Sequence, residues 1–66
     1  MEKREIVLDG KKTMADARAT SIRQLLAALH ISPQEALVKV NGKIRPESAP
    51  LAKKDRVEVI RVVFGG

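Results

Sequence analysis

The sequence predicts an α+β fold in which one helix packs across one face of a mixed sheet of four to five strands. Two dipeptides that favour hairpin turns, Asp9-Gly10 and Asn41-Gly42, flank a short amphipathic stretch, and the β-rich run "VEVIRVVF" follows up to Phe64. The predicted order is strand, strand, helix, strand, strand, strand. With 66 residues, 44% of them hydrophobic, the chain has the size of one small domain with an aliphatic core.

The first two strands are predicted to form a hairpin. Ile6 and Leu8 alternate in "REIVLDG", which ends in the first turn dipeptide, and "KKTMADA" supplies the returning strand. The β propensity of this second strand is weak. The segment from Met14 onward could equally join the following helix.

The helix is predicted to begin after Thr20 or Ser21, because Ser21 and Gln24 have the spacing of a capping box. Four aliphatic residues then share one face of a helix of about three turns: Ile22, Leu25, Leu26 and Leu29. His30 falls in the last turn, and Pro33 prevents the helix from continuing.

A second hairpin is predicted after the helix. The run "VKV" alternates before Asn41-Gly42, a dipeptide suited to two-residue turns because both central residues need positive φ. A short strand over residues 43–45 follows, and Pro46 ends it because proline cannot donate to the ladder. The segment "PESAPLAKKD" reads as a loop with one buried anchor at Leu51.

The last strand, "RVEVIRVVF", has apolar residues on both faces. Val57 and Val59 point one way, whereas Ile60, Val62 and Phe64 point the other way. Because one helix covers only one face, two interpretations remain open. Either a bulge shifts the register after Val59, or part of the second set lies on the open face as a partner surface.

The sequence contains few residues that could catalyse a reaction without a partner. It contains no cysteine, which excludes disulfides, thiolate nucleophiles and Cys-based metal sites. His30 is the single histidine, and its position favours a surface role or a favourable charge at the helix end. No glycine-rich loop precedes the helix to hold a phosphate, and no nucleophile motif is present. We therefore expect a protein that is not an enzyme and binds no metal or cofactor itself.

The net charge and the hydropathy pattern indicate which partners and which compartment to expect. The net charge of +5 comes from 13 Lys and Arg against 8 Asp and Glu, with no basic run longer than two, which favours an ordinary solvated surface. No stretch approaches the roughly 20 apolar residues of a membrane span. The charged start "MEKRE" leads into no signal-peptide apolar region. A cytoplasmic location without membrane contact is the expectation.

The whole chain resembles the ubiquitin-like β-grasp proteins in length and element order. The specific likeness lies in "VKVNGKIRP", in the strand that follows Asp55 and in Gly65-Gly66. Within that group the chain is similar to the sulfur carriers ThiS and MoaD, and "DRVEVIRVVFGG" looks closest to the small archaeal modifier proteins. ThiS-like proteins more often have Gly-Asp where this chain has Lys54-Asp55, a departure that points away from ThiS proper.

The resemblance implies a ubiquitin-like carrier or protein modifier. In that family an E1-like partner enzyme uses ATP and Mg²⁺ to adenylate the carboxylate, here that of Gly66. A sulfur donor then produces a thiocarboxylate for a sulfur-accepting enzyme, or a target-protein lysine takes the acyl group in an isopeptide bond. The resemblance thus implies a β-grasp domain over residues 1–64 and a flexible tail, Gly65 and Gly66. A frayed end is the alternative interpretation of the two glycines.

The same resemblance suggests a docking surface for the activating or sulfur-accepting partner at Ile60, Val62 and Phe64. For Phe64 the alternative is a core position at the strand end. An RNA-binding β-grasp module of the TGS type is the competing function, and the net charge of +5 would suit it. Stacking on single-stranded nucleic acid generally needs several aromatic residues, and Phe64 is the only one, so nucleic acid is a disfavoured partner.

Overall fold

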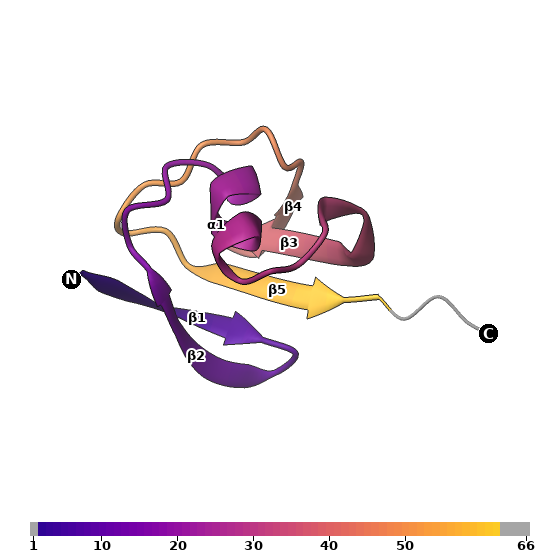
Figure 1. The fold of residues 1–66 in the computed structure, drawn as a ribbon, viewed down its shortest axis with the longest axis horizontal. Coiled ribbons are helices and arrows are strands. Elements are labelled where there is room, and N and C mark those ends of the chain that lie inside the picture. Colours follow the sequence, from indigo (N-terminus) through magenta and orange to yellow (C-terminus); the bar gives the residue numbers. More distant parts are fainter. Residues whose placement is uncertain (1, 63–66) are drawn as a thin grey trace.

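The computed structural model describes residues 2–62 (Figure 1); Phe64, Gly65 and Gly66 lie outside the described residues. The elements in chain order are β1 (Lys3–Leu8), β2 (Lys11–Asp16), α1 (Ile22–Ala28), the 3-10 turn η1 (Pro33–Glu35), β3 (Ala36–Val40), β4 (Lys43–Arg45) and β5 (Val57–Arg61). This order confirms the predicted sequence of strands with a single helix after the second.

The sheet has the strand order β2-β1-β5-β3-β4. Strands β1 and β5 are parallel, and the other neighbouring pairs are antiparallel, so the sheet is mixed. The last strand of the chain therefore lies in the centre of the sheet, and α1 crosses one face of it, as Figure 1 shows. This arrangement is the predicted α+β fold of the β-grasp type.

Both hairpins turn as their dipeptides predict. Asp9 and Gly10 have φ of 50° and 82°, and Asn41 and Gly42 have φ of 54° and 84°. Positive φ at both central residues matches the right-handed twist of the strands that they connect. The returning strand β2 pairs with β1 from Lys11 to Asp16, so the interpretation that placed the segment from residue 14 in the helix was wrong.

The start of α1 is capped as predicted, with one difference. The Ser21 hydroxyl accepts the Gln24 backbone N–H at 3.2 Å. The Gln24 side chain reaches back one residue further than in a standard capping box, because its Oε1 accepts the backbone N–H of Thr20 at 2.9 Å. The bond to Ser21 satisfies a backbone donor that the first helical turn would otherwise leave without a partner. The bond from Thr20 ties down the residue that precedes the N-cap.

The helix is shorter than predicted, and His30 lies beyond it. Residue Leu29 is the C-cap, and His30 follows with φ of 60°, in the left-handed region. The His30 N–H bonds the Ala27 carbonyl at 3.1 Å and the Ile31 N–H bonds the Leu26 carbonyl at 2.9 Å. This bond pair is a Schellman motif, so the backbone turns out of the helix three residues before Pro33.

The core lies between α1 and the sheet. It contains the buried residues Ile6, Ala15, Ile22, Leu25, Leu26, Val38, Val40, Ala49, Leu51, Val57 and Val59. Leu51 is buried as predicted. The long connection before β5 also packs on the start of α1: the Ile22 N–H bonds the Ala49 carbonyl at 3.1 Å, and the Leu51 N–H bonds the Thr20 carbonyl at 2.9 Å.

Candidate functional site

The register of β5 decides between the two interpretations of its apolar residues. Its pairing with β3 runs from Val57 opposite Val40 to Arg61 opposite Ala36 without a slip. The bulge interpretation is therefore wrong for these residues. Ile60 lies opposite Leu37 on the face that α1 does not cover, where it is half-buried.

The open face carries apolar side chains that the sequence reasoning did not select. Leu37 and Ile44 have 46% and 61% of their surface exposed, and Met14 has 56% exposed. Leu37 lies beside Ile60, and Ile44 lies opposite Lys39 on the same face. The sequence contained a signal for Leu37, because it alternates out of phase with the buried Val38 and Val40.

Charged residues separate the apolar members of this face. Val7 of β1 lies between Lys12 of β2 and Glu58 of β5, and Glu58 in turn lies opposite Lys39. Non-obligate interfaces share such a mixture of apolar and charged side chains with ordinary protein surfaces, so the composition alone does not mark this face as an interface. The Leu37 and Ile60 pair is its best-defined apolar contact, since the two residues are direct cross-strand neighbours.

The end of β5 is held from both sides. The Asp9 carboxylate accepts the Arg61 backbone N–H at 2.9 Å through Oδ1 and the Arg61 Nε at 2.6 Å through Oδ2. On the other side, the Val62 N–H bonds the Glu35 carbonyl at 2.7 Å. The β1–β2 turn and η1 therefore position the strand end that leads toward Gly66.

These bonds also lower the pKa of Asp9. The largest cause is the backbone hydrogen bond from Arg61, followed by the bond from the Arg61 side chain. Sequence reasoning treated Asp9 only as a turn residue and missed this role. No local pattern signals it, because Asp9 and Arg61 are 52 positions apart.

Two of the five predicted site residues fall among the described residues. Ile60 and Val62 are both half-buried at the end of the central strand. Phe64, Gly65 and Gly66 lie outside the described residues. Between residues 2 and 62, no group of three or more acidic or histidine side chains is arranged to hold a metal ion. No helix in that range has the length and apolar character to cross a membrane.

Comparison with known protein families gives a match over nearly the whole chain. The family model described as "ThiS family" matches residues 2–66. The match includes every described element, the Lys54-Asp55 departure and both glycines.

Proposed function

Because the chain belongs to the ThiS family of small ubiquitin-like sulfur carriers, we propose that Gly66 bears the carboxylate that is activated and that carries sulfur. In the first step the carboxylate attacks the α-phosphate of ATP and displaces pyrophosphate, which forms an acyl-adenylate. A hydrosulfide donor then displaces AMP and leaves a thiocarboxylate on Gly66. The activating enzyme supplies the nucleotide site and Mg²⁺.

The observation that carries this proposal is the family match, because it extends through Gly65 and Gly66. The chemistry of the two residues supports it. Glycine has no Cβ, so a Gly-Gly end can take backbone shapes closed to other residues and can pass through a narrow channel. The acyl carbon of Gly66 is also unshielded by a side chain, which leaves a clear approach for the attacking nucleophile.

The bonds at the end of β5 support the same assignment. Arg61 and Val62 donate to Asp9 and Glu35 from a strand that is paired on both sides. A rigid strand end four to five residues before the reacting carboxylate reduces the conformational freedom that is lost when the enzyme binds. The domain would thus present Gly66 from a defined point.

We also propose that the open face beside this strand docks the activating or sulfur-accepting partner. Leu37 and Ile60 would form its apolar centre, with Val62 and Phe64 extending it toward the glycines. The Phe64→Ala substitution should then weaken partner binding more than it lowers the free energy of unfolding. If it destabilises folding more than binding, Phe64 belongs to the core.

The same activated carboxylate could be transferred to a lysine amine, which would make the chain a protein modifier. The intact mass of the protein from its native cell, with fragment ions covering residues 64–66, separates the two outcomes. A thiocarboxylate localised to Gly66 supports the sulfur carrier. Larger species with a Gly-Gly remnant on lysine, found with an unmodified Gly66, support the modifier.

Localisation to Gly66 is essential in this experiment. Oxidation of Met1 or Met14 changes the mass by nearly the same amount as exchange of oxygen for sulfur. A protein expressed without Gly65 and Gly66 is the matched control, because it retains both methionines. If neither modification is found, the carrier assignment fails and the RNA-binding alternative should be tested by titration with single-stranded RNA.

A further inference from the structure

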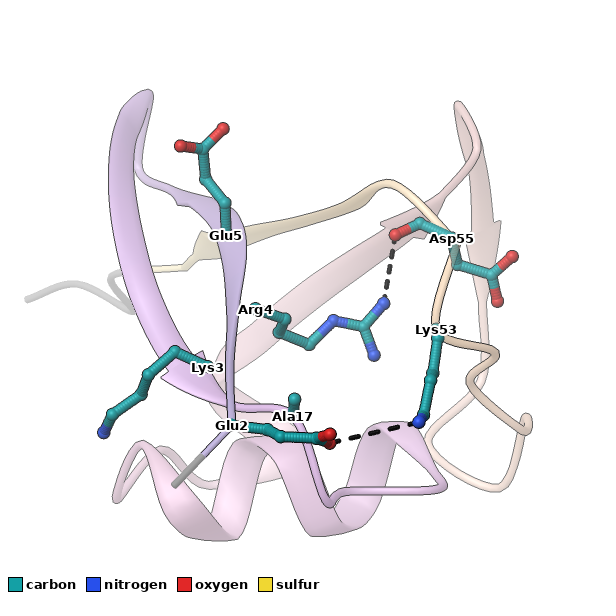
Figure 2. Close-up of a pocket in the computed structure, with 7 residues that line it drawn as sticks. All are labelled: Glu2, Lys3, Arg4, Glu5, Ala17, Lys53 and Asp55. Atoms are coloured by element: carbon teal, nitrogen blue, oxygen red, sulfur yellow. Dashed lines mark hydrogen bonds and ion pairs between the residues drawn. The ribbon is translucent and has the colours of Figure 1, made fainter.

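A pocket of about 370 Å³ lies at the start of β1, between that strand and the connection that precedes β5. Strands β1 and β5 are parallel, so this pocket lies near the start of β5, whereas the chain leaves the sheet after Arg61 at the other end. Figure 2 shows Arg4 extending from β1 across the pocket toward Asp55, with Lys53 and Glu2 beside it. The pocket is therefore separate from the end of β5 and from the site proposed above.

Arg4 is a buried charge, with 8% of its surface exposed. Its Nη2 donates to the backbone carbonyls of Ala52 and Asp55, each at 3.0 Å. Its buried Nε has no acceptor among the residues that the structure describes. Guanidinium remains protonated in proteins, so Arg4 keeps a full positive charge while both of its acceptors are neutral. A buried cation in this state is costly unless an anion compensates it.

The nearby carboxylate of Asp55 is engaged elsewhere. It accepts the Ala52 backbone N–H at 2.8 Å and the Asn41 Nδ2 at 3.0 Å, and in Figure 2 it points away from the guanidinium. These two bonds are the largest causes that lower the pKa of Asp55, and the charge of Arg4 is the smallest contribution. Asp55 therefore holds the loop and does not serve as the ion-pair partner of Arg4.

The remaining charges at the pocket leave Arg4 uncompensated. Lys3 and Glu5 also line the pocket, but they alternate with Arg4 along β1, and neither forms an ion pair with it. Glu2 and Lys53 form a loose pair at 4.0 Å, with side chains 67% and 82% exposed. No ion pair within residues 2–62 includes Arg4. The pocket thus combines the buried guanidinium of Arg4, whose Nε–H is an unused donor, with the exposed ammonium group of Lys53 at its rim.

We propose that this pocket is a binding site for a small oxyanion, a carboxylate or a phosphate group. Such a group would accept hydrogen bonds from the guanidinium of Arg4 and a charge-assisted bond from the ammonium of Lys53. The carboxylate of Glu2 would compete with the bound oxyanion for Lys53, because it already lies 4.0 Å from the Lys53 ammonium group. The oxyanion comes either from an acidic side chain of a bound protein or from free phosphate in solution.

Titration followed by NMR tests this site directly. Uniformly ¹⁵N-labelled protein is titrated with sodium acetate and, separately, with sodium phosphate, while sodium chloride keeps the ionic strength constant. We expect saturable shifts of the Arg4 Nε–Hε signal and of the amides of Lys53 and Asp55. Saturation should occur in the range of about 1–50 mM, as for a few charge-assisted hydrogen bonds to a small ion.

Substitutions at two exposed residues, Glu2 and Lys53, test the site without disturbing the core. The Glu2→Gln variant should bind more tightly, by about threefold or more, because it removes the competing carboxylate, and Lys53→Gln should bind more weakly by a similar factor. The Arg4→Gln variant should lose the shifts. Arg45→Gln is the matched control for Arg4→Gln. It removes the same positive charge, but from an exposed position on β4.

The outcomes separate the sources of the anion. Tighter saturation by phosphate than by acetate favours free phosphate as the source, and tighter saturation by acetate favours a carboxylate of a bound protein. Equal saturation supports a general oxyanion site that accepts both. Absence of saturable shifts with both anions, in the wild type and in Glu2→Gln, overturns the proposal. So does an Arg45→Gln variant that loses the shifts as completely as Arg4→Gln.

Discussion

Replacement of His30 by glycine should stabilise the protein, although glycine usually destabilises ordered elements. His30 has φ of 60° and ends α1 through the Schellman bonds. The left-handed conformation costs a residue with a Cβ about 1–2 kcal/mol. Its side chain is exposed, so its removal sacrifices little packing. Glycine relieves the backbone strain and keeps both hydrogen bonds.

An effect on the unfolded state reduces the stability that His30→Gly gains. Glycine gives the unfolded chain more freedom, which costs about 0.4–1 kcal/mol on folding. The net increase in the free energy of unfolding should therefore lie within about 0–1.6 kcal/mol, with a midpoint of about 0.8 kcal/mol. For a domain of 66 residues this midpoint corresponds to an increase in Tm of about 6 °C. Such a change is measurable against a total stability of roughly 3–10 kcal/mol.

The measurement is urea denaturation followed by far-ultraviolet circular dichroism, with thermal unfolding as a second readout. His30→Ala is the control, because it also removes the imidazole but keeps a Cβ in the left-handed region. We expect His30→Gly to be more stable than both His30→Ala and the wild type. If glycine is no better than alanine, backbone strain at this position does not limit stability and the reasoning is refuted.

Three further predictions concern the core, the surface carboxylates and the glycines. Leu26→Ala should lower the free energy of unfolding by about 2–5 kcal/mol in urea denaturation, because Leu26 is 1% exposed under α1; an effect as small as that of the exposed Met14→Ala would contradict this packing. Hydrogen bonds from the side chain and backbone of Arg18 lower the pKa of Asp16 to about 2. A lowered folded-state pKa means that this carboxylate stabilises the fold above its usual pKa of 3.8 and loses that contribution as the pH falls toward 2. The urea midpoint should therefore fall over this interval, and Arg18→Gln should flatten part of the decline; an identical profile in the variant would count against it. Deletion of residues 65–66 should leave Tm unchanged and abolish the proposed adenylation by an activating enzyme, so a truncated protein that is still adenylated would remove these residues from the proposed mechanism.

Local elements were predictable from the sequence because their causes are local. The two hairpin dipeptides require positive φ, which Asp9 and Asn41 adopt. The cap at Ser21 and the apolar stripe of α1 follow from spacing within one or two helical turns. The family was also predictable from the sequence, because the order of the elements and the Gly-Gly pair can be read from the chain itself. The end of α1 was predicted less well, since a histidine takes the left-handed position where glycine is the usual signal.

Only the tertiary structure decided which residues meet across the sheet. Periodicity assigns a side chain to one of two faces but names neither the neighbouring strand nor the face that α1 covers. The pairing of β5 with β3 placed Ile60 beside Leu37 on the open face and excluded the bulge. The same packing brought Asp9 to Arg61 over a separation of 52 residues and Arg4 to Asp55 over 51. These contacts depend on long-range strand pairing, which local propensity does not encode, because the free energy that selects it comes from burying one shared core.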